Sequence, residues 1–433
     1  MCHWPGSDPL SREAGEGWGG GASSIPNLPP GTTLRILSDG SAGHEAQTLG
    51  VAQALGVTPD IRCVAPRAIY AALAPFTPAD PRDGFAHAPP YPDIAIAAGR
   101  RTLPALKRLK RDSGGRTFTV YLNKPANGLS AADLIIAPRH DGLRGANVFS
   151  PLTPANRLTP ERLAAARAAP DPRIAALPRP RIALIVGGDS RHGAYGAKDI
   201  AALEHIAASL LASGRGVMAT ASRRTPTALR ERLRRALAAP SGFFWDGEGE
   251  NPYLSMLANA DAIVVTGDSV NMVGEAVATA APVYVVPPPG RRGKIDAYLG
   301  ALRDAGAIRI WSGALEDWRR APVNATPDIA RAVAQAIRPL PRRVVNFERP
   351  SLFCAALPWQ GARLLEAFGR PPIAALAQLV EHLIRNEGVG GSNPSSGTKP
   401  IFDHAGIVRV ALGADRDHVL TTFCSCGTLA IAN

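Results

Sequence analysis

The chain has 433 residues, of which 45% are apolar, and a formal net charge of +12. The length allows two or three domains, and the apolar fraction is ordinary for a globular protein with a core, which excludes a disordered or fibrous chain. The arginines are scattered singly or in pairs without interleaved aromatic residues, so no nucleic-acid partner is expected, and the charge points instead to phosphorylated small molecules or anionic lipid.

The first orderly region is expected to be one domain over residues 32–165. It follows a leader of residues 1–31 that is rich in Gly, Ser and Pro and is expected to be disordered. Apolar runs predict strands, and helical spacing predicts helices, in alternation. The predicted strands are 34–39, 93–99, 117–123 and 133–138, and the predicted helices are 41–56 and 101–112.

The same alternation restarts after a proline-punctuated stretch, 151–180, which predicts a short helix and an interdomain linker over 166–180. A second domain is expected over residues 181–340. Its predicted strands are 181–190, 216–222, 243–247, 260–269 and 281–289. Its predicted helices are 199–214, 225–239, 251–260, 270–280, 294–306 and 325–338. Strands that alternate with helices in this way predict an α/β fold of two Rossmann-like doubly wound parallel-sheet domains.

The pattern fails beyond residue 340. Residues 374–398 resemble a transfer-RNA gene translated as protein, because Gly391-Ser392-Asn393-Pro394 matches a T-arm and Ala377 to His382 match a D-arm. Our hypothesis is that residues 341–433 are a frameshifted or read-through tail without a site. A nucleotide sequence without a tRNA cloverleaf under these codons would exclude it.

The cysteines bear on compartment and cofactors. They form neither a zinc spacing nor a disulfide framework, so no metal or other cofactor is expected and a reducing compartment is the default. The five are Cys2, Cys63, Cys354, Cys424 and Cys426. The chain begins without a signal-peptide pattern and contains no apolar run long enough to span a membrane. The expected location is cytoplasmic, with a peripheral position at the inner face of the membrane as a further option.

The stretch VVTGDSVNMVGEA, residues 264–276, is the first candidate ligand site. A strand that ends in Thr266, Gly267, Asp268 and Ser269 and runs straight into a helix presents backbone N–H groups that attract phosphate. Glu275 lies within two turns, where it would reach ribose hydroxyls. An ordinary turn with a capping Asp or Ser and an exposed Glu fits the spacing equally well.

SDGSAGHEAQ, residues 38–47, is the second candidate site. A small-residue loop is followed by His44 at the start of a helix, where a histidine can act as general base or bind phosphate. Asp39 is the other candidate base. A histidine bonded to the local backbone fits the same sequence.

Two more strand ends carry residues that suit anions. Gly187, Gly188 and Ser190 follow one strand, and Ser222 and Arg223 follow another. Neither stretch matches the Gly-x-Gly-x-x-Gly dinucleotide fingerprint or a Walker loop. Plain glycine turns with solvated arginines fit these stretches of sequence equally well. In open α/β sheets, ligands bind outside the carboxyl ends of the strands, so all these turns predict one site in the cleft between the two sheets.

Seven ordered blocks between residues of about 33 and 340 resemble one family, the mitochondrial-fission "elongated mitochondria" (ELM) family of bacteria and plants. The blocks are SDGSAGHEAQ, IAAGRRTLPALK, NKPANG with DLIIAPRHD, GGDSRHGAYG, ATASRRTP, FWDGEGENPY and VTGDSVNMVGEA. The resemblance implies a link to mitochondrial fission, since plant members are associated with recruiting a dynamin-related protein. Bacterial members have no settled activity and are often labelled as nucleoside-diphosphate-sugar proteins.

A more distant resemblance is to GT-B glycosyltransferases, which have two Rossmann domains. It implies that Gly43 and His44 open the first domain, and that Ser269 and Glu275 hold a nucleotide-sugar. The loop DGSAGH departs from the GGTGGH of the peptidoglycan enzyme, and acceptor-side residues do not map, so the resemblance implies binding more than catalysis.

The leading hypothesis is a GT-B-like protein that binds a nucleoside-diphosphate sugar in the interdomain cleft, with sugar transfer left open. His44 or Asp39 would be the base, and Gly267, Ser269, Arg223 and Glu275 would hold the donor. The alternative is a non-catalytic scaffold that binds a partner protein or an anionic membrane surface.

Overall fold

The computed structural model describes residues 28–190, 193–290 and 293–337, together with four short strands in the C-terminal unit Val345–Asn433. These strands are β13 (Ile401–Phe402), β14 (Val408–Arg409), β15 (Leu420–Phe423) and β16 (Leu429–Ala432), paired antiparallel as β13 with β14 and β15 with β16. Nearly all of the expected leader 1–31 and most of the expected tail 341–433 lie outside the described residues. Both expectations stay predictions.

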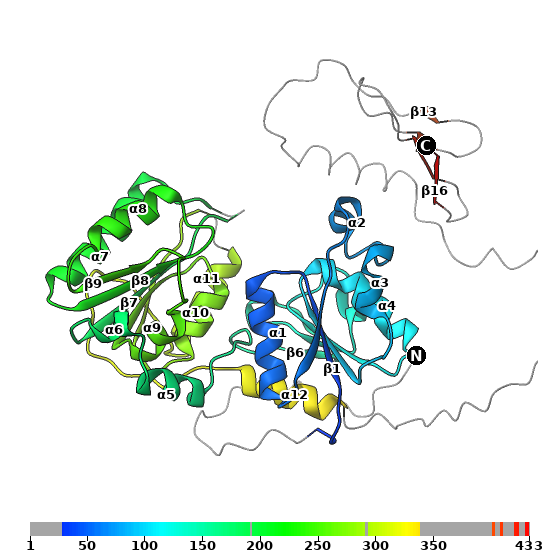
Figure 1. The fold of residues 1–433 in the computed structure, drawn as a ribbon, viewed down its shortest axis with the longest axis horizontal. Coiled ribbons are helices and arrows are strands. Elements are labelled where there is room, and N and C mark those ends of the chain that lie inside the picture. The colour runs from blue at the N-terminus through cyan, green and yellow to red at the C-terminus, as the bar shows by residue number, and fades with distance from the viewer. Residues whose placement is uncertain are drawn as a thin grey trace, which may run out of the picture. The chain divides into compact units, whose positions relative to one another are not determined.

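The first sheet has six parallel strands in the order β2-β1-β3-β4-β5-β6 (Figure 1). The strands are β1 (Leu34–Ser38), β2 (Pro59–Cys63), β3 (Ile94–Ala98), β4 (Phe118–Leu122), β5 (Leu134–Ile136) and β6 (Val148–Phe149). β1, β3, β4 and β5 are buried along their whole length, which explains why they read as continuous apolar runs in the sequence. The edge strand β2 is largely exposed and polar, and the sequence pattern therefore did not predict it.

The second sheet also has six parallel strands, in the order β12-β11-β10-β7-β8-β9. The strands are β7 (Arg181–Val186), β8 (Gly216–Ala221), β9 (Gly242–Trp245), β10 (Ala262–Thr266), β11 (Val283–Val286) and β12 (Arg309–Ile310). The five longer strands are the five that the sequence predicts. Both orders reverse direction beside the first strand of the sheet, as in doubly wound folds.

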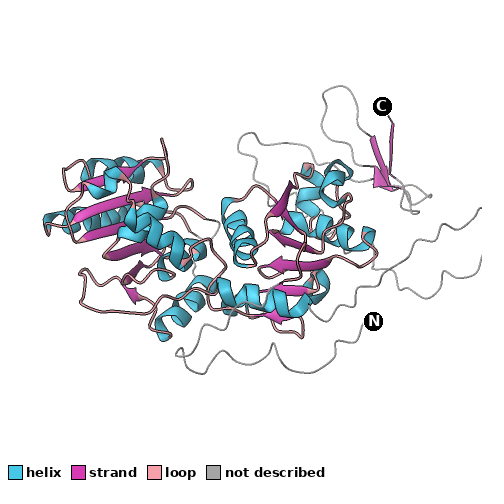
Figure 2. Ribbon diagram, turned by 60° about the horizontal axis from the view of Figure 1, so that its bottom comes forward, coloured by secondary structure: helices cyan, strands magenta, loops and turns pink. Residues whose placement is uncertain are grey.

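Helices cover both faces of each sheet (Figure 2). The α-helices are α1 (Ala42–Ala54), α2 (Ala68–Leu73), α3 (Gly84–His87), α4 (Leu103–Asp112), α5 (Pro160–Ala168), α6 (Pro172–Ala175), α7 (Ala197–Ala212), α8 (Thr227–Ala236), α9 (Tyr253–Asn259), α10 (Val270–Val277), α11 (Gly293–Asp304) and α12 (Thr326–Ile337). Short 3₁₀ turns are η1 (Pro81–Asp83), η2 (Arg100–Thr102), η3 (Gly128–Ala131) and η4 (Arg139–Asp141). Neighbouring strand residues therefore belong to different cores: Ile36 packs with α1 and α12, and Leu37 packs with α4.

The last helix, α12, packs on the first sheet (Figure 1) and not on the second. Its buried residues Ile329 and Val333 lie in one core with Ile36 and Val51. The expected domain boundary counted this helix with the second sheet, because sequence order alone gives no sign of the return. Residues 166–180, the expected linker, likewise pack on the second sheet, because Ile174 and Leu177 lie in one of its hydrophobic cores.

The chain crosses between the two sheets twice, and the two crossings are hydrogen-bonded to each other. The amide of Asn156 donates to Oγ1 of Thr326 at 2.9 Å, and the Thr326 hydroxyl donates to the carbonyl of Asn156 at 3.2 Å. The amide of Ala325 donates to Oγ1 of Thr153 at 3.2 Å. The crossings are thus fixed side by side, with all these groups buried.

A substitution at Gly50 of α1 tests how closely this helix packs against the first crossing. A Cβ at this position would overlap the carbonyl oxygen of Asn156, which is backbone and cannot rotate away. We expect Gly50→Ala to lower the free energy of unfolding by about 2 kcal/mol, a typical cost of overpacking. Gly300→Ala in α11 is the matched control, because its Cβ would meet open space, and a gain of up to about 1 kcal/mol is expected there. Equal denaturant midpoints for the two variants would contradict close packing between α1 and the first crossing.

Candidate functional site

The turn from β1 into α1 forms a hydrogen-bonded acid–imidazole pair. Nδ1 of His44 lies 3.0 Å from both carboxylate oxygens of Asp39. Burial acts to raise the pKa of Asp39, but the hydrogen bond and charge of His44 outweigh it, so this pKa is lowered. An ionised carboxylate only accepts hydrogen bonds, so Nδ1 carries the proton, and in the neutral ring Nε2 is then an acceptor. This arrangement suits a general base.

A glycine of the neighbouring strand end makes room for this pair. Gly99 follows β3 with φ at +89°, in the region that disfavours other residues. A Cβ at Gly99 would overlap the carboxylate of Asp39 and the ring of His44. The burial and charge that raise the pKa of Tyr121 on β4 include a contribution from Asp39. The ends of β1 and β3 therefore pack closely around the pair of Asp39 and His44.

Asp268 organises the corresponding edge of the second sheet. Its Oδ2 accepts the backbone N–H of Gly188 at 3.0 Å, and its Oδ1 accepts the hydroxyls of Thr266 at 2.7 Å and Tyr195 at 2.9 Å. A guanidinium nitrogen of Arg224 lies 3.5 Å from Oδ2. The carboxylate, 6% exposed, occupies the place where the sequence analysis expected a bound anion.

The predicted phosphate donors at this edge are consequently engaged within the protein. The amide of Gly187 donates to the hydroxyl oxygen of Thr266 at 2.7 Å, and the amide of Gly267 donates to the carbonyl of Val286 at 2.9 Å. Thr266 and Gly267 are buried. A Cβ on Gly187 would overlap Asp268. The glycines therefore serve close packing of three strand ends, and the structure leaves their amides no free capacity for a phosphate.

Ser269 and Glu275 lie on the part of this edge that stays open. Ser269 caps α10 by accepting the N–H of Met272 at 3.4 Å, and the first amides of a helix have no partner within it. Glu275 is partly buried, and its Oε2 accepts the hydroxyl of Tyr253 at 2.8 Å. Burial raises the pKa of Glu275, against the opposing effect of this hydrogen bond. Because a carboxylate accepts several hydrogen bonds, Glu275 retains capacity for a ligand hydroxyl.

The remaining predicted residues lie in two turns beside Asp268. The Oγ of Ser222 lies 3.1 Å from Oγ1 of Thr225, inside its own turn, and Arg223 is exposed. Ser190 pairs through its amide with the carbonyl of Gly193 at 2.9 Å. In the described part of the chain, the hydrogen bonds of Ser222 and of the Ser190 amide thus stay within their own turns.

Amide side chains that the sequence analysis did not single out join the two edges. Nε2 of Gln47 on α1 donates to Oδ1 of Asn271 on α10 at 2.7 Å, and Nδ2 of Asn123 donates to Oε1 of Gln47 at 3.1 Å. A Cβ on Gly43 would overlap the side chain of Asn271. The first turns of α1 and α10 are therefore in contact. The signal in the sequence was slight, because Gln47 and Asn271 look like ordinary polar helix positions.

A second contact joins η4 and α11. The ring of His140 packs against that of Tyr298 at 4.9 Å between centroids, and Lys294 is paired with Asp141. Tyr298 in turn donates its hydroxyl to the carbonyl of Val270, the first residue of α10, at 3.3 Å. The start of α10 thus contacts α1 through Asn271 and α11 through Tyr298.

Two doubly wound parallel sheets, joined in series and touching at the first turns of α1 and α10, define a two-domain Rossmann-type α/β protein. The sequence model of one family, described as Mitochondrial fission ELM1, matches residues 42–337. The chain belongs to the mitochondrial fission ELM1 family.

Curated relatives support this membership. Mitochondrial fission protein ELM1 of Arabidopsis thaliana is 29% identical over 280 residues, which cover 57% of this chain and 64% of the relative. Uncharacterized protein RP120 of Rickettsia prowazekii is 27% identical over 165 residues, or 36% of this chain and 46% of the relative. The chain thus spans less than two thirds of either relative.

Solved structures that are similar to this chain have low sequence identity and low TM-scores. The UDP-GlcNAc 2-epimerase of Methanocaldococcus jannaschii has a TM-score of 0.39 at 10% identity, with 70% of this chain and 100% of that chain covered. MurG of Acinetobacter baumannii has a TM-score of 0.37 at 15% identity, with 71% and 95% covered. The two strand orders confirm the predicted α/β class with two Rossmann-like doubly wound parallel-sheet domains.

Two features are absent from the described residues, a cluster of metal-binding side chains and a membrane-spanning helix. No three His, Cys, Asp or Glu side chains gather there as a metal site would require. No helix in those ranges is both long and apolar enough to cross a bilayer.

Asp268→Ala tests the organising role of this carboxylate. The change leaves the amide of Gly188 and the hydroxyl of Tyr195 without their acceptor, and each such loss costs about 1–3 kcal/mol. We expect unfolding free energy to fall by about 3 kcal/mol in chemical denaturation. Asp199→Ala is the control, because Asp199 accepts one exposed amide, that of Gly196, and a loss of about 1 kcal/mol is expected. A smaller loss for Asp268→Ala than for the control would contradict this role.

Proposed function

We propose that this protein binds a nucleoside-diphosphate sugar beside the contact between the first turns of α1 and α10. The observation that carries the proposal is the hydrogen bond of 2.7 Å between Gln47 and Asn271, because it brings the His44–Asp39 pair and the start of α10 to one place. Two independent strand-end turns, one with a base and one with helix amides, thus face a common ligand position. This is the expected ligand edge of open α/β sheets.

The diphosphate is proposed to lie on the start of α10. The free amides at Val270 and Asn271, the helix dipole and the hydroxyl of Ser269 favour negative charge there. Gly187, Gly188, Thr266 and Gly267 are not part of this proposed site, because their amides or side chains already form hydrogen bonds within the protein. Glu275, one turn further on, is proposed to accept hydrogen bonds from the ribose hydroxyls.

Sugar transfer is the reaction that this arrangement would support. Nε2 of His44 would accept the proton of an acceptor hydroxyl as its oxygen forms a bond to the anomeric carbon. The bond from that carbon to the diphosphate would break, and the electron pair would leave with the diphosphate, whose charge the start of α10 stabilises. Asp39 would hold the imidazole and stabilise its protonated form.

Isothermal titration of the full chain with uridine and guanosine diphosphates and their sugars tests binding. We expect heat of binding with at least one of them, and about tenfold weaker binding for Glu275→Gln, which keeps an acceptor for Tyr253 but loses charge-assisted hydrogen bonds to the ligand. Glu231→Gln on the exposed side of α8 is the matched control and should bind as the unaltered chain does.

His44→Ala separates binding from chemistry. The variant should bind the nucleotides with unchanged affinity in the titration, but it should no longer release nucleoside diphosphate from the nucleotide-sugar. The absence of heat with every nucleotide would exclude the proposal and favour the non-catalytic scaffold, whose partner binding should survive both Glu275→Ala and His44→Ala.

A further inference from the structure

Large apolar side chains are exposed mainly in one segment of the first domain. Of the six large hydrophobic residues exposed in the described ranges, four lie between residues 61 and 85. They are Ile61, Ile69, Phe76 and Phe85, with exposed fractions of 50%, 57%, 73% and 51%. We name residues 61–85, which include the end of β2, α2, η1 and the start of α3, the apolar cap. Such a concentration is typical of an interaction surface.

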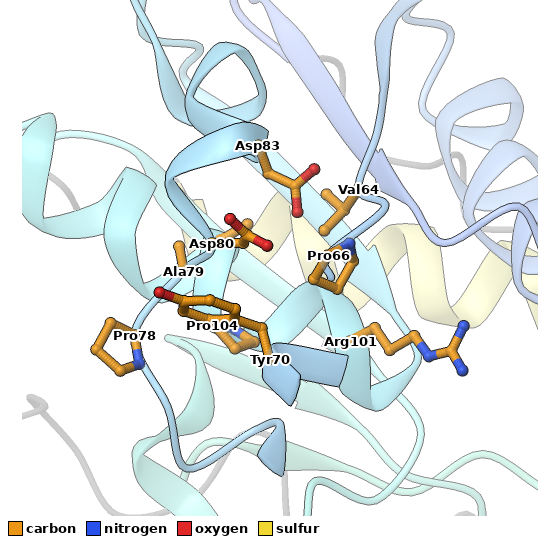
Figure 3. Close-up of a pocket in the computed structure, with 10 residues that line it drawn as sticks. Val64, Pro66, Tyr70, Pro78, Ala79, Asp80, Asp83, Arg101 and Pro104 are labelled. Atoms are coloured by element: carbon orange, nitrogen blue, oxygen red, sulfur yellow. The ribbon is translucent and has the colours of Figure 1, made fainter. Parts of the chain in front are cut away.

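The apolar cap is braced by buried carboxylates. The guanidinium of Arg67 donates to both oxygens of Asp80 at 3.0 Å, and Oδ1 of Asp83 accepts the amide of Ala65 at 3.0 Å. Figure 3 shows Asp80 and Asp83 turned inward beside Val64, in a small pocket under Tyr70. The hydrogen bond and charge of Arg67, acting against burial, hold the pKa of Asp80 at about 2. The exposed rings are therefore displayed by a fixed structure and not by a loose loop.

Among the described residues, the exposed charges around the apolar cap that have no ion-pair partner are positive. Asp80 and Asp83 are buried, and Asp60 is bonded to Arg35 and Arg62 at 2.9 Å. Every carboxylate of β2 and the apolar cap is thus buried or paired. The exposed guanidinium groups belong to Arg82 in the apolar cap and to Arg100 and Arg101, which follow β3.

Arg100 and Arg101 lie directly against the apolar cap. Arg100 donates to the carbonyl of Ala72 at the end of α2, at 3.4 Å, and Arg101 lines the same pocket as Tyr70. In Figure 3 the guanidinium of Arg101 points away from the carboxylates. Exposed aromatic side chains with exposed arginines in the same part of the fold match a surface with an apolar interior and negative headgroups.

We propose that the apolar cap docks this protein on an anionic membrane surface, with Phe76 and Phe85 entering the interface and Arg82, Arg100 and Arg101 contacting lipid phosphates. The charge of these arginines favours this occupant over a second copy of the chain, which would bring the same positive charges together. The side chains assigned to the membrane surface are different from those assigned to the nucleotide, although Arg100 and Arg101 directly follow Gly99.

Sedimentation of the full chain with lipid vesicles is the test. We expect binding to phosphatidylcholine vesicles that contain about 30% phosphatidylglycerol, at least fivefold weaker binding to pure phosphatidylcholine, and release by about 0.5 M salt. The double change Phe76→Ser and Phe85→Ser should weaken binding about tenfold, and Arg100→Gln with Arg101→Gln should reduce the preference for anionic vesicles.

The matched control is Ile310→Ser, which removes an exposed apolar side chain from β12 of the second sheet and should bind vesicles as the unaltered chain does. Thermal melts report whether each variant is folded, and free phosphatidylglycerol headgroup should not compete. Equal binding to both vesicle types, or unchanged binding by the folded Phe variant, would overturn the proposal. Loss of a chain dimer in that variant, without vesicle binding by the unaltered chain, would assign the apolar cap to a second copy instead.

Discussion

The reciprocal hydrogen bonds between Asn156 and Thr326 fix the architecture of the two domains. They join the segment that leaves the first sheet to the segment that returns to it. Because these groups are buried, each bond would be costly to lose without a replacement. With both crossings fixed, α12 reaches the first core and the starts of α1 and α10 are held in contact range. The candidate site is therefore a product of the chain path as much as of its own side chains.

The two edges of the site are built differently. On the first sheet, the acid–imidazole pair of Asp39 and His44 is partly open, and Gly99 leaves space for it. On the second sheet, Asp268 closes most of the edge by satisfying its amides and hydroxyls. In the proposed site, a ligand phosphate would therefore lie at the start of α10 and not on the amides that Asp268 and its neighbours occupy. This contrast explains why the glycines before α7 are packing residues although they resemble an anion-binding turn.

The sequence predicted the fold well where burial sets the pattern. Nine of the twelve strands in the two parallel sheets were predicted, because they are apolar runs, and all but the half-buried β9 are largely buried. The three others are β2, a polar edge strand, and β6 and β12, which have two residues each. Prediction of the site was less complete. The sequence identified the pair of Asp39 and His44 and the turn before α10. It could not show that the carboxylate of Asp268 fills the predicted anion position, because an aspartate in this turn has the same local sequence whether it caps a helix or lies in the site. The link from Gln47 to Asn271 joins residues 224 positions apart, and no local spacing can show such a contact.

The position of α12 has a consequence for synthesis on the ribosome. Domains of multidomain chains generally fold in the order in which they emerge. Here the core around Ile36 and Val51 stays incomplete until Ile329 and Val333 have been made, and these residues follow the last strand of the second sheet in the chain. The half that is translated first is thus the half that finishes last, and a ribosome that stops early releases a complete second sheet beside an open first one.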